Sequence, residues 1–158
     1  MHLRTLSQLH ILRLDDTQVT DAGLAHIQGL RQLEWLGLEN TQVVGAGLVH
    51  LQALGRLQHL YLSRTRVADA GLAHLQGLGQ LQELWLDHTQ VTDAGLVHLQ
   101  ALWQLKYLWL YNTQVTDAGL LHLHGLSKLE VLDLGSTKVT GQGIRKLQEA
   151  LPKCTIGH

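Results

Sequence analysis

The chain has 158 residues, which fits one domain, and 45% of them are hydrophobic, enough for a continuous core. The formal net charge is −1, so no overall charge draws it to nucleic acid or to an anionic membrane, and we expect it to bind neither. No apolar run reaches the length of a membrane span, and the start, MHLRTLSQLH, lacks the apolar stretch of a signal peptide. Cys154 is the single cysteine, which excludes an internal disulfide and slightly favours a cytoplasmic location.

A motif close to VTDAGL recurs every 24 residues and organises the whole chain. It begins at Val19, Val43, Val67, Val91, Val115 and Val139. Repetition at such a period indicates a solenoid, in which each coil buries its apolar side chains against its neighbours. We therefore predict a single domain, 1–158, built from six 24-residue repeats.

The chain opens with MHLRTLSQL, which aligns with AHIQGLRQL one repeat later. It therefore starts inside a predicted helix, with no separate N-terminal cap. End repeats need a polar outer face for solubility. We accordingly expect either that the chain is a piece of a longer array or that it dimerises through its open N-terminal end.

A short strand precedes the motif in each coil. In the stretch LEWLGLENTQV, Leu36 and Leu38 alternate with Trp35, Gly37 and Glu39. A period of two residues predicts a strand with one buried face and one exposed face.

A helix is predicted to follow each strand. In VTDAGLAHIQGLRQL, Leu24, Ile27 and Leu30 recur at steps of three and indicate a buried stripe. Thr20 or Asp21 is expected to cap the start of this helix. Three glycines lie near the predicted helix ends, where left-handed backbone conformations are common: Gly29, Gly77 and Gly125.

The last segment departs from the repeat, because IRKLQEALPKCTI runs on longer than its counterparts. Pro152 ends the predicted helix, and the alternation of Cys154 and Ile156 predicts a final short strand. Residues 141–158 are therefore expected to form a C-terminal cap.

The pattern LxxLxLxxTxV followed by TDAGL resembles the leucine-rich-repeat family, in its bacterial TDAGL type, over residues 3–156. The resemblance implies an α/β fold, a right-handed solenoid with a parallel β-sheet on the concave face and helices on the convex face. It does not fix an activity, because one fold hosts many functions. Where the family usually has asparagine after the strand, this chain has threonine. The resemblance implies that these hydroxyls face inward and hydrogen-bond the turn backbone of neighbouring coils: Thr17, Thr41, Thr65, Thr89, Thr113 and Thr137.

The outward strand positions change from coil to coil, although the inward positions are nearly always leucine. Of the seven aromatic residues, all but Trp103 occupy these outward positions: Trp35, Tyr61, Trp85, Tyr107, Trp109 and Tyr111. Parallel strands lie about 4.8 Å apart, so Tyr61, Trp85 and Trp109 should stack as one column, with Trp35 and Tyr107 flanking it near His59. Contiguous exposed aromatic side chains usually mark interaction sites.

The same outward face carries more acidic than basic residues. Arg13 and Arg64 stand against the six acids Asp15, Asp16, Glu39, Glu83, Asp87 and Asp133. Such a face favours a partner with exposed lysine or arginine, which can also lie over the rings. The predicted partner-binding residues are Trp35, His59, Tyr61, Glu83, Trp85, Asp87, Tyr107, Trp109, Tyr111 and Asn112.

Histidine recurs once per coil on the predicted helices, at His2, His26, His50, His74, His98 and His122. One such residue per coil is sparse for a metal site, so we interpret the series as tolerated surface residues. His59, Glu83, Asp87 and His88 form a second candidate cluster, which matches no ligand motif. Repeats of equal length leave no insertion to build an active site, and no nucleophile or phosphate-loop motif is present. We predict no catalytic residues, no cofactor and no metal.

The sequence therefore predicts a non-enzymatic module that recognises a protein or peptide with a basic patch. Two alternatives stay open. The stacked aromatic residues could bind a glycan or a small molecule, or the chain could be a structural, self-assembling and even engineered repeat scaffold. Self-association would then form a homodimer through the concave face or through the open N-terminal end.

Overall fold

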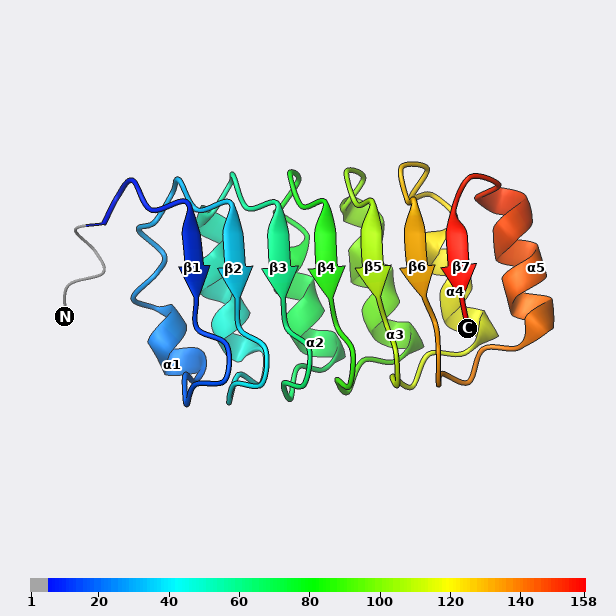
Figure 1. Cartoon of the computed structure of the whole chain (residues 1–158), viewed down its shortest axis with the longest axis horizontal. Helices are drawn as coiled ribbons and strands as arrows, with labels where there is room; N and C mark the ends of the chain where they lie inside the picture. The colour runs from blue at the N-terminus through cyan, green and yellow to red at the C-terminus, as the bar shows by residue number, and fades with distance from the viewer. Residues whose placement is uncertain (1–5) are drawn as a thin grey trace.

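Seven three-residue strands form one parallel sheet in the computed structural model, which describes residues 6–158. The strands follow one another in chain order and lie side by side, with the helical segments behind them (Figure 1). Their bounds are β1 (Ile11–Arg13), β2 (Trp35–Gly37), β3 (His59–Tyr61), β4 (Glu83–Trp85), β5 (Tyr107–Trp109), β6 (Val131–Asp133) and β7 (Thr155–Gly157). This is the α/β leucine-rich-repeat solenoid that the repeat predicted. The concave face of the prediction is the sheet face turned away from the helices, and we call it the open face.

The register explains why the repeat is strict. Residues 24 apart are paired, so Leu60 of β3 stands between Leu36 of β2 and Leu84 of β4. All three are fully buried, as are most of the leucines and valines at inward positions. Each coil therefore completes the core of the next one, as expected of a solenoid.

The helical segments are shorter than predicted. Single α-turns occur at α1 (Asp21–Leu24), α2 (Asp69–Leu72), α3 (Asp93–Leu96) and α4 (Asp117–Leu120). They lead into 3₁₀ turns in later coils, η3 (Ala73–Leu75), η4 (Val97–Ala101) and η5 (Leu121–Leu123), and the second coil has the 3₁₀ helix η2 (Ala46–Ala53) alone. A spacing of three residues between buried side chains matches the 3.0 residues per turn of a 3₁₀ helix better than the 3.6 of an α-helix.

Left-handed residues occur at a place that the sequence analysis missed. Gly29, Gly77 and Gly125 do not adopt a positive φ, so that prediction was wrong. Instead φ is 51–58° at the second residue past the last inward leucine of each strand, namely Asp16, Asn40, Arg64, His88, Asn112 and Ser136. The N–H groups of most of these residues donate to a carbonyl of the next coil, as Asn40 does to Ser63 at 2.9 Å. The hydrogen bonds between coils thus continue two residues beyond the last inward leucine, and the backbone adopts the left-handed conformation there.

The threonines that follow the strands bond within their own coil, which corrects the expectation of bonds to neighbouring coils. The Thr41 hydroxyl donates to the Leu38 carbonyl at 2.7 Å, and Thr65 donates to Leu62 at 2.6 Å. Both side chains are buried. A hydroxyl on a short side chain reaches the carbonyl three residues back, and so it satisfies the turn locally.

The motif aspartates link neighbouring coils. Asp69 accepts hydrogen bonds from the Thr92 backbone N–H at 2.8 Å and from the Thr92 hydroxyl at 2.7 Å. Asp93 and Thr116 repeat this arrangement one coil later. The Thr20 side chain makes no capping bond at α1, so that prediction was wrong for Thr20, whereas at α3 the Thr92 hydroxyl accepts from the Ala94 N–H at 3.3 Å.

The C-terminal end closes with the longest helix, α5 (Gly141–Ala150), and then β7. The Thr140 hydroxyl accepts from two backbone N–H groups at the start of α5, and the helix ends two residues before Pro152. Burial raises the pKa of the Cys154 thiol to about 11, so very little of it is thiolate at neutral pH. Part of the helix predicted at the chain start falls on residues 1–5, outside the described residues. Within residues 6–158 no helix is both long and apolar enough to cross a membrane.

Candidate functional site

Four aromatic rings from consecutive strands form a column along the open face. The ring centroids are 4.6 Å apart for Trp35 and Tyr61, 5.0 Å for Tyr61 and Trp85, and 4.7 Å for Trp85 and Trp109. Tyr107 stacks beside Trp109 at 6.0 Å. All five side chains are half-buried, because neighbouring rings partly cover one another. We call the four rings the aromatic column.

Trp35 belongs to this column, although the sequence suggested only that it flanks it. Gly37 occupies the column position of β2 and leaves space there. A Cβ atom on Gly37 would lie 2.7 Å from Cζ3 of the Trp35 ring and 2.5 Å from both Asp15 carboxylate oxygens. The Trp35 ring therefore crosses over Gly37 to reach Tyr61. The Arg13 guanidinium carbon lies 4.9 Å from the Trp35 ring centroid, so the protein's own cation covers this end of the column.

Glu83 fixes the orientation of the rings. Its carboxylate accepts hydrogen bonds from the Tyr61 hydroxyl and from Nε1 of Trp85, both at 2.9 Å, and lies 2.7 Å from Nδ1 of His59. Burial, followed by the bond to Glu83, raises the pKa of Tyr61 to about 12. Of the predicted site residues, Glu83 and His59 thus hold the column in place.

A hollow of about 270 Å³ lies beside the column, at the carboxyl ends of the strands, and we call it the acidic hollow. Its lining combines the side of the Trp85 ring with polar residues: Glu39, Ser63, Arg64, Asp87, His88, Tyr111 and Asp133. The Asp87 carboxylate accepts from the Tyr111 N–H at 2.8 Å and from the Ser63 hydroxyl at 3.3 Å. At the rim, the predicted site residue Asn112 lies 2.8 Å from Nδ1 of His88, and the His88 ring contacts the edge of Tyr111.

The acids of this hollow lie close to one another and are partly buried. Burial raises the pKa of Asp87, the charge of Asp133 adds to the rise, and the bonds from Tyr111 and Ser63 partly oppose it. Burial and then the charge of Asp15 raise the pKa of Glu39. When these partly buried carboxylates are ionised they repel one another, and a positive charge placed among them would relieve that repulsion.

Asp87→Asn is expected to stabilise the protein at neutral pH. Because the pKa of Asp87 is raised in the folded state, its ionised form opposes folding, and this penalty is present above the folded pKa and absent below the unfolded pKa. Asparagine keeps an oxygen for the Tyr111 N–H. We expect a Tm gain of about 1–3 °C at pH 7, modest because solvent screens the site, and none below about pH 4. Thermal melts from pH 3 to 8 test this; a gain that persists at acid pH would contradict it.

The second candidate cluster of the sequence analysis does not form a single group. His59 and Glu83 meet at the base of the rings, whereas Asp87 and His88 line the acidic hollow. Among residues 6–158 no group of three or more His, Cys, Asp or Glu side chains is arranged to hold a metal ion.

The histidine series lies on the helical side of the coils. His26 is exposed and the next four members are half-buried. Gln76 pairs with His98 and Gln100 pairs with His122, each at 3.0 Å and each between adjacent coils. His2 falls outside the described residues.

Comparison with known proteins agrees with this architecture. A family model described as Leucine Rich repeat matches residues 125–147. Comparison with curated protein sequences gives no match. Among solved structures, a leucine-rich-repeat protein of Leptospira interrogans superposes with a TM-score of 0.81 at 23% identity, over 99% of this chain and 38% of that one.

Two internalins of Listeria monocytogenes are also similar. InlF has a TM-score of 0.69 at 21% identity, over 98% of this chain and 49% of that one. Internalin C2 has a TM-score of 0.64 at 26% identity, over 99% of this chain and 73% of that one. The chain thus shares the leucine-rich-repeat fold with these bacterial proteins, and it spans less than half the length of the first two.

Proposed function

We propose that this chain is a non-enzymatic binding module that recognises a protein or peptide through its aromatic and acidic open face. The observation that carries this proposal is the aromatic column with the acidic hollow alongside it. Leucine-rich-repeat folds commonly serve as protein-interaction modules, since stacked coils present one extended surface.

The aromatic column supplies the apolar part of such a contact. Trp and Tyr are the residue types that most often dominate protein interfaces, because a rigid ring gives a large contact area for little loss of entropy. The bonds from Tyr61 and Trp85 to Glu83 hold two of these rings before any partner arrives. A preformed surface loses less conformational entropy on binding.

The charge distribution favours a basic partner. Arg13 covers the end of the column at Trp35, but at the other end Trp109 pairs in register with Asp133, an acid. A lysine or arginine from a partner would meet Asp87 and Asp133 in the acidic hollow and the Trp85 ring beside it. A second copy of the same acidic face would be repelled, which argues against a homodimer through this surface.

The geometry of the rings favours a protein over a glycan. A sugar stacks on a free ring face, whereas the rings of the aromatic column cover one another at 4.6–5.0 Å. The polar atoms of Tyr61 and Trp85 are already bonded to Glu83. Because the rings are only half-buried, part of each ring and the adjacent carboxylates stay available, and these suit side chains of a protein.

Selection of binders from a random peptide display library tests this function. Selected peptides should carry lysine or arginine and should lose affinity about 30-fold or more against Trp85→Ala/Trp109→Ala, as expected when interface hot spots are removed. Trp103→Ala is the matched control, because Trp103 is 55% exposed and lies off the open face. Affinity should also fall as salt is raised.

Two results would count against the proposal. Peptides whose affinity is unchanged in the double variant would place binding elsewhere. Binding of glycans on an array, lost in the double variant and insensitive to salt, would favour the glycan alternative. Light scattering over a range of concentrations separates self-association from both.

A further inference from the structure

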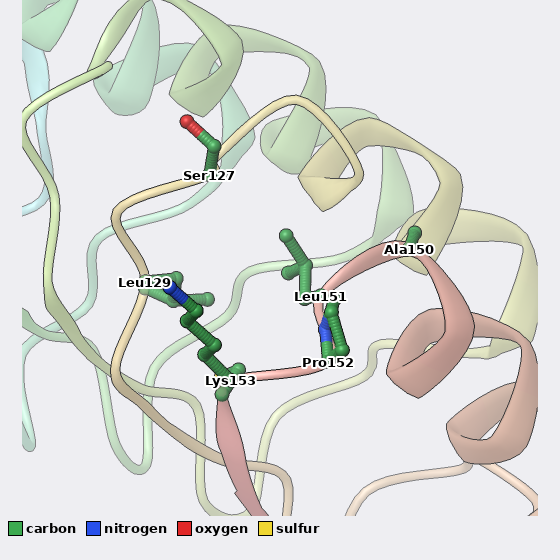
Figure 2. Close-up of a pocket in the computed structure, with 7 residues that line it drawn as sticks. Ser127, Leu129, Ala150, Leu151, Pro152 and Lys153 are labelled. Carbon is green, nitrogen blue, oxygen red and sulfur yellow. The ribbon is translucent and has the colours of Figure 1, made fainter.

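A second candidate site lies at the amino ends of the last strands, across the sheet from the acidic hollow at their carboxyl ends, and it is formed in part by the C-terminal cap. A pocket lies between the loop that leads to β6 and the turn that follows α5 (Figure 2). Its volume is about 230 Å³. Its walls are mainly apolar: Leu129, Ala150, Leu151, Pro152 and Cys154. We call it the cap pocket.

The wall of the cap pocket is held rigidly. The Gln148 side-chain amide donates to the carbonyls of Leu151 and Cys154, both at 2.9 Å. The Cys154 N–H donates to the Leu151 carbonyl at 3.1 Å, and the Thr155 N–H donates to Glu130 of the preceding coil at 2.8 Å. The pocket is therefore preformed, which lowers the entropic cost of filling it.

A wider groove of about 480 Å³ adjoins the cap pocket and shares Ser127, Leu129 and Lys153 with it. Lys106 and Lys128 also line this groove, and Glu130 is its one acidic residue. We call it the lysine groove. It is basic, although the chain as a whole has a net charge of −1.

The cations of the lysine groove are incompletely neutralised. Lys106 lies 4.0 Å from Glu130, whose carboxylate also accepts from the Tyr107 hydroxyl at 3.0 Å. Lys128 donates to the neutral Gln104 side chain at 2.6 Å. Lys153 has no ion pair within residues 6–158, and its side chain runs past the mouth of the cap pocket toward Leu129 (Figure 2).

We propose that the cap pocket and the lysine groove together bind the C-terminal residue of a polypeptide. Its apolar side chain fills the cap pocket, and its carboxylate lies between Lys153 and Lys128. The preceding peptide groups follow the groove, where the side-chain amides of Gln82 and Gln104 can bond them. Because the groove is larger than the pocket and has these amides, it suits a chain end rather than a short free acid. This site is separate from the open face and does not depend on its function.

The test compares the tripeptide acetyl-Ala-Ala-Leu as the free acid and as the C-terminal amide, titrated into the full chain and followed by NMR. We expect the acid to bind with a submillimolar Kd, to shift the amide signals of residues 150–154, and to bind at least about tenfold more tightly than the amide, which is the loss expected for one charge-assisted contact.

Variants locate the site. Lys153→Glu should weaken binding of the acid at least about tenfold, and Ala150→Trp, which fills the cap pocket, should do the same. Lys138→Glu is the matched control: it makes the same charge change at an exposed position outside both hollows, and it should stay within about twofold. The circular dichroism melt of each variant shows that it is folded.

Several outcomes would overturn the proposal. One is that the acid shows no binding at a concentration of about 10 mM, because a Kd weaker than that is negligible. The others are equal binding of acid and amide, and equal losses in Lys153→Glu and Lys138→Glu. Octanoate that binds as tightly as the tripeptide would assign the site to a free fatty acid and overturn the assignment to a chain terminus.

Discussion

Leu108→Ala is expected to lower the free energy of unfolding by about 3–5 kcal/mol, as for other leucines removed from a rigid core. Leu108 is fully buried in β5 and stands between Leu84 and Leu132 of the adjacent coils. Coils on both sides hold these neighbours in place, so they cannot close the cavity. Because each coil contacts only adjacent coils, the weakened middle should also broaden the unfolding transition.

Urea denaturation followed by circular dichroism measures this loss, and Leu121→Ala is its control. Leu121 lies on η5 and is 61% exposed, so its truncation should change the free energy of unfolding by less than about 0.5 kcal/mol. Similar losses in both variants would mean that the inward strand leucines do not form the core.

Gly47→Ala is expected to cost about 2–4 kcal/mol, a typical penalty for forcing a group into a closely packed site. Its N–H donates to Asp21 of the preceding coil at 2.9 Å. A Cβ atom at Gly47 would lie 2.6 Å from both Cα and the carbonyl oxygen of Asp21. Since backbone atoms cannot rotate away, the two coils must separate. The hydrogen bonds that the Val44 and Gly45 N–H groups donate to the Asp21 carboxylate would then weaken.

Gly77→Ala is the matched control for this substitution. An added Cβ at Gly77 meets no atom within 4 Å, and its φ is not positive. We expect a change below about 0.5 kcal/mol, or a slight gain, because alanine restricts the unfolded chain. Thermal and urea melts of both variants make the comparison. A tolerated Gly47→Ala would show that the coils are further apart than the structure has them.

The two stability predictions bear on binding. The aromatic column lies on strands whose other face is the leucine core, so ring spacing follows strand spacing. Leu108→Ala should therefore weaken the binding of a ligand to the open face by loosening Trp109, although Leu108 itself would not contact that ligand. Trp85→Ala/Trp109→Ala should remove the contact and leave the core leucines in place.

Much of the site was predictable because it follows from alternation. Once Leu84 and Leu108 point inward, Trp85 and Trp109 must point outward, and a 24-residue period places them in register. The column of Tyr61, Trp85 and Trp109 follows from those two facts. Gly37 was the one signal of the longer column: a residue without a side chain, in a series otherwise filled by large ones, leaves space for Trp35.

Other features could not be inferred from the pattern. The bonds of Glu83 to Tyr61 and Trp85 depend on rotamers that neighbouring rings decide. The reach of a threonine hydroxyl to its own turn, and the left-handed residues after the strands, depend on a backbone path that a repeat motif does not specify. The cap pocket arises where the repeat ends, so no internal comparison between coils reveals it.

The solenoid, the inward leucines and the outward aromatic and acidic residues all follow from the sequence pattern alone. These follow from a period of two along each strand and a period of 24 along the chain, both of which are local properties of the covalent chain. The folded structure was needed to show which rings touch, which carboxylates are partly buried, and where lysines border an apolar pocket. Those features depend on volumes and charges brought together from different coils, and no single repeat contains them.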